Sequence, residues 1–143
     1  MSAAPFLPDA YLTLVGILLL SLVAVETGGV LLVRVATGRH PVNALQTSFF
    51  RAGHAHAAVL LVLAIALLGP LGQVDPGGLV GVVARTGVPL AAILMPAGFF
   101  LSVLGRDPQR PGRLVALLWI GAASLTAGLL AAGFTLLSAG LTE

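Results

Sequence analysis

The residues best suited to chemistry lie together in one short segment of an otherwise apolar sequence. Arg51, His54 and His56 stand in the run Phe-Phe-Arg-Ala-Gly-His-Ala-His-Ala-Ala, which continues directly into a long aliphatic stretch. Ionisable side chains inside a membrane helix are costly unless they are paired or act as ligands. The segment therefore predicts a functional site, and the question is what these side chains hold.

The composition places this site in a membrane. Hydrophobic residues make up 58% and charged residues 8% of the 143 residues, with a mean hydropathy of +1.08. Four apolar segments, roughly residues 11–33, 52–71, 78–104 and 114–140, each approach or exceed the ~20 residues that cross a bilayer as a helix. We predict an all-α fold, a single integral membrane four-helix bundle that contacts the lipid bilayer and passes the cell membrane four times. Any chemistry must then occur inside the membrane or at its face.

The arginines predict the orientation of these spans. Six of the seven basic residues flank the first and third connections, and the second connection carries Asp75 without a basic residue. The six are Arg34, Arg39, Arg51, Arg106, Arg110 and Arg113. Because basic residues in short loops stay in the cytoplasm, we predict the N and C termini outside. The net charge of +2 comes from this bias, so nucleic acid is not an expected partner.

The lack of cysteine narrows the candidate ligands. Zero cysteines exclude disulfides, iron–sulfur clusters and thiolate ligands. A metal would have to be held by histidine, glutamate or the main chain.

A carboxylate on the first span lies at the same depth as the two histidines. Counted at 1.5 Å per residue, Glu26 lies about 12 Å, and His54 and His56 about 9–12 Å, from the cytoplasmic boundary. The two spans run antiparallel, and Gly28 and Gly29 allow their backbones to approach closely. Glu26 is therefore expected to reach the second span.

A simpler interpretation needs no ligand. Intramembrane charges commonly neutralise one another. Glu26 then forms a charge pair with Arg51 or Arg85, and this polar network only fixes how the helices pack.

The two histidines must face different surroundings. At 100° per residue, positions two apart on a helix differ by about 200°, so His54 and His56 cannot both bind one small ion from the same side. His54 shares its face with Arg51. One imidazole is expected to face the bundle interior and the other a neighbouring subunit, unless each merely hydrogen-bonds a carbonyl or Glu26.

At the start of the second span, Arg-Ala-Gly-His-Ala-His resembles the Arg-Ala-His segment of the membrane-bound styrene-oxide isomerases and, more distantly, of the hydroxylaminobenzene mutases. The stretch Met-Pro-Ala-Gly-Phe-Phe-Leu-Ser at 95–102 is similar to a glycine–aromatic–serine stretch of those isomerases. The resemblance covers about a quarter of the chain. It implies a four-helix protomer assembled as a homo-oligomer, a trimer, with haem b at the subunit interface and an axial histidine, here His54 or His56.

The resemblance also implies a reaction. Ferric haem held by one imidazole keeps an axial position open and acts as a Lewis acid, which suits isomerisation of an epoxide or N–O bond in a small apolar substrate. Arg51 suits a haem propionate. The isomerases carry an Asn about six residues after the ligand and a Tyr on the third span, whereas this chain has Leu60 or Val62 and Phe99 or Phe100 there. This chain therefore lacks the Asn and the Tyr that help to orient the substrate in those isomerases.

Three further comparisons or interpretations point to other functional classes. Gly-His-Ala-His also resembles the Gly-His-x-His of haem–copper oxidases, whose two histidines ligate on opposite faces of one helix. This resemblance serves only as an analogy for ligation on both faces of the second span. Pro89 and Pro96 predict a third span that kinks or opens at two points. With Glu26 and the histidines, such a span favours a small oligomeric channel or transporter for protons, ions or small solutes. A third alternative is an accessory subunit of a membrane complex, in which the polar cluster fixes assembly.

The fourth span is rich in small residues. Gly121, Ala123, Ser124, Ala127, Gly128 and Ala131 lie within three turns. Small residues let helix backbones approach, so this span is expected to pack closely within or between protomers.

Overall fold

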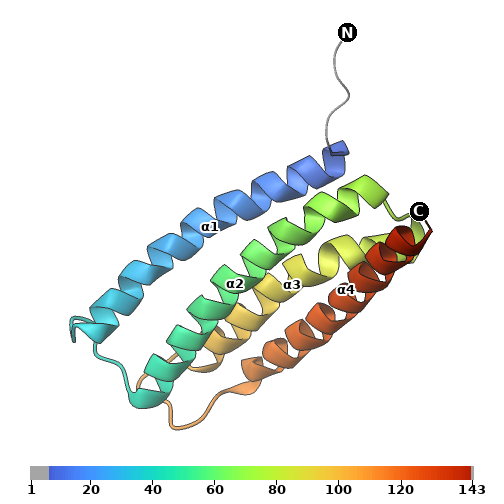
Figure 1. Cartoon of the computed structure of the whole chain (residues 1–143). Coiled ribbons are helices and arrows are strands. Elements are labelled where there is room, and N and C mark those ends of the chain that lie inside the picture. Colours follow the sequence, from blue (N-terminus) through green and yellow to red (C-terminus); the bar gives the residue numbers. More distant parts are fainter. Residues whose placement is uncertain (1–6, 143) are drawn as a thin grey trace.

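The described part of the chain forms four long helices joined by short connections (Figure 1). The computed structural model describes residues 7–142. Its helices are α1 (Asp9–Ala36), α2 (Ala44–Val74), α3 (Gly78–Ser102) and α4 (Ala116–Leu141), with a short 3₁₀ helix, η1 (Arg113–Val115), ahead of α4. All four long helices are apolar enough to cross a membrane. The predicted all-α, four-helix membrane fold is confirmed.

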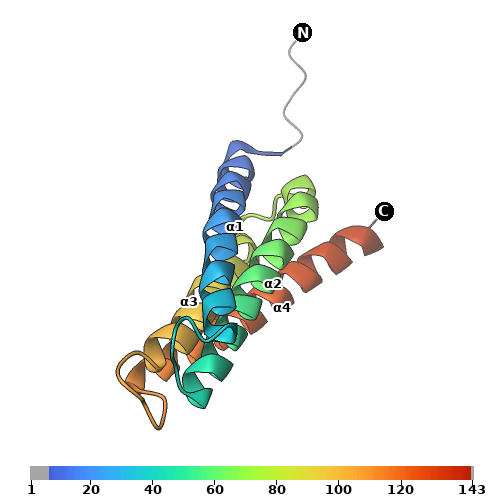
Figure 2. The same ribbon diagram turned by 90° about the vertical axis from the view of Figure 1, so that its left-hand side faces the viewer.

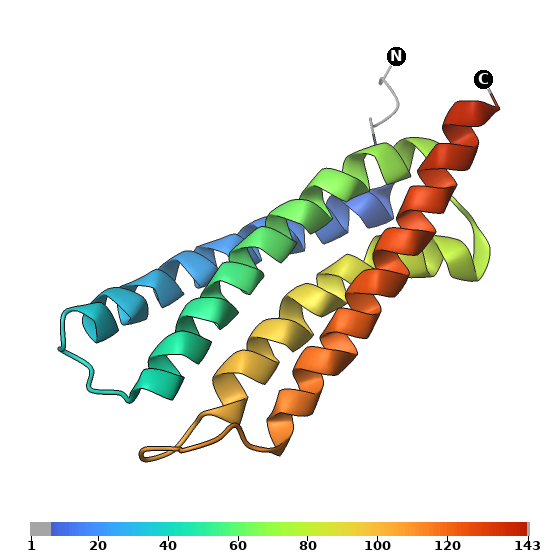
Figure 3. The ribbon, with the colours of Figure 1, turned by 60° about the horizontal axis from the view of Figure 1, so that its bottom comes forward.

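The helices lie side by side in chain order. Figure 3 shows α2 and α3 between α1 and α4. The α3–α4 pair is the most extensively packed, and α1 packs mainly on α2. Figure 2 shows both arginine-bearing connections at one end of the bundle, opposite the start of α1 and the end of α4. Six of the seven arginines therefore gather at one end, as the predicted orientation requires, whereas Arg85 lies beside Tyr11 near the other. Which end faces the cytoplasm stays a prediction.

Helix α2 begins at Ala44, eight residues before residue 52, where the hydropathy predicts the second span to start. Asn43 caps it: its side chain accepts a hydrogen bond from the Gln46 backbone N–H, and the Gln46 side chain accepts one from the Asn43 N–H. This reciprocal pair satisfies two N–H groups that a helix start otherwise leaves free. The early start adds two turns to α2 and places Phe50 against Phe100, with ring centroids 5.5 Å apart.

The same cap ties α2 to the connection between α3 and α4. Gln46 is only 7% exposed, and its Nε2 donates to the backbone carbonyls of Val103 and Gly105 at 3.0 and 3.1 Å. Asn43 Nδ2 donates to Asp107 Oδ1 at 2.8 Å. These bonds fix the depth and rotation of α2, and therefore the positions of the histidines that follow.

Replacing Gln46 with leucine is expected to lower the free energy of unfolding by about 2 kcal/mol, because the buried Val103 carbonyl and the partly buried Gly105 carbonyl lose their donor. Thermal unfolding in mild detergent measures the change. Gln109→Leu is the matched control, since the Gln109 side chain bonds only the Asp107 carbonyl at an exposed site. Equal melting temperatures for the two variants would show that the tie does not stabilise the fold.

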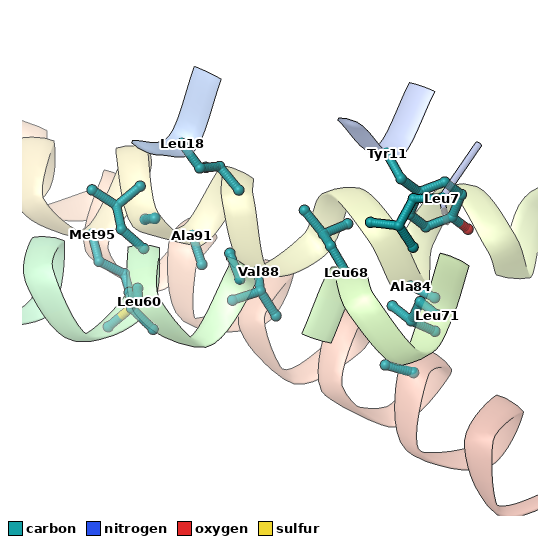
Figure 4. Close-up of a cluster of buried hydrophobic side chains, with 14 residues drawn as sticks. Leu7, Tyr11, Leu18, Leu60, Leu68, Leu71, Ala84, Val88, Ala91 and Met95 are labelled. Atoms are coloured by element: carbon teal, nitrogen blue, oxygen red, sulfur yellow. The ribbon is translucent and has the colours of Figure 1, made fainter. Parts of the chain in front are cut away.

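The apolar core lies mainly between α2 and α3. Leu68 and Leu71 of α2 pack with Ala84 and Val88 of α3, and Tyr11 of α1 covers them from one side (Figure 4). The outer surfaces of α1 and α4 remain open to the membrane. The most exposed large apolar side chains include Leu20, Leu79, Trp119, Phe134 and Leu141.

The small residues of α4 pack within the protomer. Gly121 and Gly128 are buried against α3, and Ser124 Oγ donates to the Gly87 carbonyl at 2.9 Å. Ala123 and Ala127 are exposed. One face of the small-residue stretch is therefore used for α3, and the other remains free for lipid or another protomer.

Helix α3 continues through both of its prolines. It runs unbroken from Gly78 to Ser102, so it does not open into separate pieces. Proline has no N–H, so Pro89 and Pro96 each leave the carbonyl four residues earlier without its intrahelical donor. Those carbonyls belong to Arg85 and Ala92.

Candidate functional site

His54 faces α1 at the paired glycines. A Cβ added to Gly28 would lie 3.6 Å from His54 Nδ1, and one added to Gly29 would lie 3.7 Å from Cε1 and 3.8 Å from Nε2. The imidazole edge that carries both nitrogens therefore lies against the α1 backbone. The glycines therefore lie level with His54, but a Cβ at either position would make only ordinary van der Waals contact, so this approach of α1 and α2 does not require glycine.

A pocket of about 280 Å³ lies beside His54 between α1, α2 and α3. Its walls are small or apolar apart from the half-buried imidazole. They are formed by Ala24, Val25, Gly28, His54, Ala57, Ala92, Pro96 and Phe100. His54 has no hydrogen-bond partner among residues 7–142, so its nitrogens are available to whatever enters this pocket.

His56 lies on the other side of α2 and is held by its own helix. Its Nδ1 is 2.8 Å from the Ala52 carbonyl oxygen. A carbonyl can only accept, so Nδ1 carries the hydrogen and donates it, and in the neutral ring Nε2 keeps its lone pair. The ring packs on Phe99 with centroids 5.0 Å apart. As expected from their spacing, the two histidines face different surroundings.

Arg51 accompanies His54 rather than His56. It is exposed and lines a second pocket, of about 360 Å³, with Leu32, Val35, Ala36 and Thr47. His54 is three positions after Arg51, which keeps the two side chains on one side of the helix. His56 is five positions after Arg51 and is turned by about 140° from it. Within one protomer, an anionic group held by Arg51 would lie on the side of His54.

The structure does not bring Glu26 into a charge pair. Glu26 is exposed on α1 and has no hydrogen bond or ion pair among the described residues, 7–142. Arg85 lies far from it, because its guanidinium carbon is 5.9 Å from the Tyr11 ring centroid. Tyr11 is fifteen residues before Glu26, or about 22 Å along the helix. Neither Arg51 nor Arg85 neutralises Glu26 within the protomer.

Sequence reasoning missed two parts of the site. The tie from Gln46 to the α3–α4 connection had a recognisable signal, since Asn-x-x-Gln ahead of an apolar run is a capping-box pattern. The pocket at His54 had no such signal, because it is formed by residues of three helices. In the part of the chain that the structure describes, no three His, Asp or Glu side chains come together to hold a metal ion.

Comparison with known proteins gives no match. No family model, curated protein or solved structure matches this chain. The function must therefore be argued from the site itself.

Proposed function

We propose that this multi-pass membrane protein binds haem b through His56 and isomerises an epoxide or N–O compound. The observation that carries the proposal is the 2.8 Å contact between His56 Nδ1 and the Ala52 carbonyl. In histidines that ligate metals, a bond from the other ring nitrogen to a carbonyl fixes the tautomer and the ring orientation and makes the ligating nitrogen more basic. His56 has this arrangement, and its Nε2 has no partner among residues 7–142.

The surroundings of His56 also suit a large planar group. Haem iron needs one protein imidazole because the porphyrin supplies the other ligands, so a cluster of three side chains is not required. The Phe99 ring lies beside the imidazole, and Val59, one turn further along α2, is 65% exposed. This side of α2 is open and apolar, as a haem face requires.

His54 fits haem less well. Its nitrogens lie against the α1 backbone at Gly28 and Gly29, where a macrocycle would have to displace the helix. The adjacent pocket, at about 280 Å³, is also smaller than the roughly 300–1,000 Å³ of ordinary ligand sites. The geometry therefore favours His56 of the two histidines that the sequence left open.

The proposal places the haem between protomers. In a ring of identical subunits, one side of each protomer meets the opposite side of the next. Such a contact brings the Arg51 side of one protomer towards the His56 side of its neighbour, where a guanidinium would pair with a propionate. The resemblance to the isomerases implies three subunits.

The residues of this chain would orient and shield the reaction. Ferric haem held by the His56 imidazole would supply a Lewis acid for a substrate oxygen. The Ala52 carbonyl holds the imidazole in one orientation, and the apolar surface beside Phe99 excludes water. Conversion of an epoxide into its carbonyl isomer consumes no external electrons, so the reaction needs no electron donor.

The first test is the absorption spectrum of the protein expressed with haem supply and purified in mild detergent. We expect a Soret band and, with styrene oxide added, formation of phenylacetaldehyde. A folded, oligomeric but colourless protein would overturn the proposal. That result would favour a path for protons or small solutes instead, because the pockets at Arg51 and His54 follow one another along the side of α1 that faces α2.

A further inference from the structure

We propose that the pocket at His54 is a second site, which binds a small aromatic alcohol. The site lies on the α1 side of α2, whereas the proposed haem ligand His56 lies on the other side and packs on Phe99. The two sites share no lining residue. The inference therefore goes beyond the proposed function and does not depend on it.

Two polar groups of the pocket lack partners that the fold would normally supply. His54 has none among residues 7–142. Pro96 has no N–H to donate to the Ala92 carbonyl four residues earlier, so that carbonyl lacks its usual helical donor. Both Ala92 and Pro96 line the pocket. In a membrane interior no bulk water satisfies such groups. A ligand that bonds them is therefore stabilised by hydrogen bonds that these groups do not form without it.

A hydroxyl group matches this pair of partners. It donates one hydrogen bond and accepts others, so it can donate to a carbonyl and accept from an imidazole N–H. An ether or ketone only accepts and leaves the Ala92 carbonyl unpaired. A carboxylate would bring another uncompensated charge, in addition to that of Glu26, into the membrane interior.

The remaining walls suit an aromatic ring. Phe100 contributes aromatic surface, and Val25, Ala57 and Gly28 add aliphatic surface. An apolar cavity of about 150 Å³ already holds benzene, so a pocket of about 280 Å³ has room for a substituted ring. Ala24 on the pocket rim is exposed, which gives an apolar alcohol dissolved in the bilayer a direct way in.

Photolabelling of the full chain in lipid nanodiscs tests this site. The probe is a benzyl alcohol that carries a trifluoromethyl diazirine, and labelled peptides are located by mass spectrometry. We expect labelling of α1, α2 and α3 around His54 that benzyl alcohol displaces and toluene, which has no hydroxyl, does not. Labelling spread over lipid-facing residues such as Leu130 and Phe134, or displaced equally by toluene, would overturn the proposal.

Matched variants separate the two hydrogen bonds from general effects. Pro96→Ala restores the N–H for the Ala92 carbonyl, and His54→Phe removes the imidazole. Each is expected to weaken benzyl alcohol competition about three- to tenfold, the value of one hydrogen bond. Pro89→Ala is the control, because Pro89 does not line the pocket. Equal competition in Pro96→Ala, Pro89→Ala and the unmodified protein would contradict the role of the Ala92 carbonyl.

Filling the pocket gives an independent check. Gly28→Leu places a side chain in the space beside His54, whereas Gly16→Leu puts the same residue where nothing lies within 4 Å of the new Cβ. Labelling should disappear in the first variant and persist in the second. His56→Ala should also label normally, so loss of haem and loss of alcohol binding are told apart.

Discussion

Replacing His56 with alanine is expected to abolish the Soret band, whereas replacing His54 with alanine should leave it largely intact. Removal of the imidazole takes away the proposed protein ligand to the iron. The other histidine of α2, His54, cannot replace it from the same side, because its imidazole lies against Gly28 and Gly29 of α1. Absorption spectra of the two variants, each expressed with haem supply, measure the difference.

Two controls make this result specific to ligation. Both variants should keep the oligomeric state of the unmodified protein in gel filtration. Added imidazole should restore the Soret band of His56→Ala, since a free ligand can enter the space that the side chain has left. A band lost in His54→Ala but kept in His56→Ala would transfer the ligand to the other histidine, and a band kept in both would contradict ligation by this segment.

Introducing valine at Gly87 is expected to separate α4 from α3. A Cβ at this position would lie 2.5 Å from the Gly128 Cα and 2.9 Å from the Ser124 carbonyl oxygen. Both are backbone atoms, which cannot move aside as the end of a side chain can. The shift would also stretch the bond from Ser124 Oγ to the Gly87 carbonyl, now 2.9 Å. We expect a loss of about 3 kcal/mol in the free energy of unfolding.

Unfolding by a denaturing detergent in mixed micelles measures this loss. Gly133→Val on α4 is the matched control, because nothing lies within 4 Å of a Cβ there. It tests the cost of a β-branched residue in a membrane helix without the contact between helices. If both variants unfold at the same detergent fraction, the close approach at Gly87 does not hold the helices together.

The number of spans and the depth of the polar segment follow from the sequence. Both depend on apolar length and on distance along a helix, which are local quantities. The different orientations of His54 and His56 follow in the same way, because two residues always turn a helix by about 200°. The start of α2 at Ala44 was also readable, from the Asn43 and Gln46 cap rather than from hydropathy.

The partners of the charged residues did not follow from the sequence. Glu26 and His54 lie at similar depth, yet Gly28 and Gly29, not Glu26, meet the imidazole. Arg85 lies beside Tyr11 instead of Glu26. Depth gives a residue's position along a helix, but a contact also requires its direction around the helix axis.

That direction was decided by the tertiary structure alone. These spans are apolar on all sides, and lipid is as apolar as a helix core, so hydropathy does not indicate which side of a span meets its neighbour. The rotations are set instead by contacts between residues far apart in the chain, such as Gly87 with Gly128 and Gln46 with Val103. The sequence by itself determined a four-span membrane protein with two histidines at one depth. Only the packing decided that His54 borders a pocket and that His56 presents a free nitrogen on the opposite side.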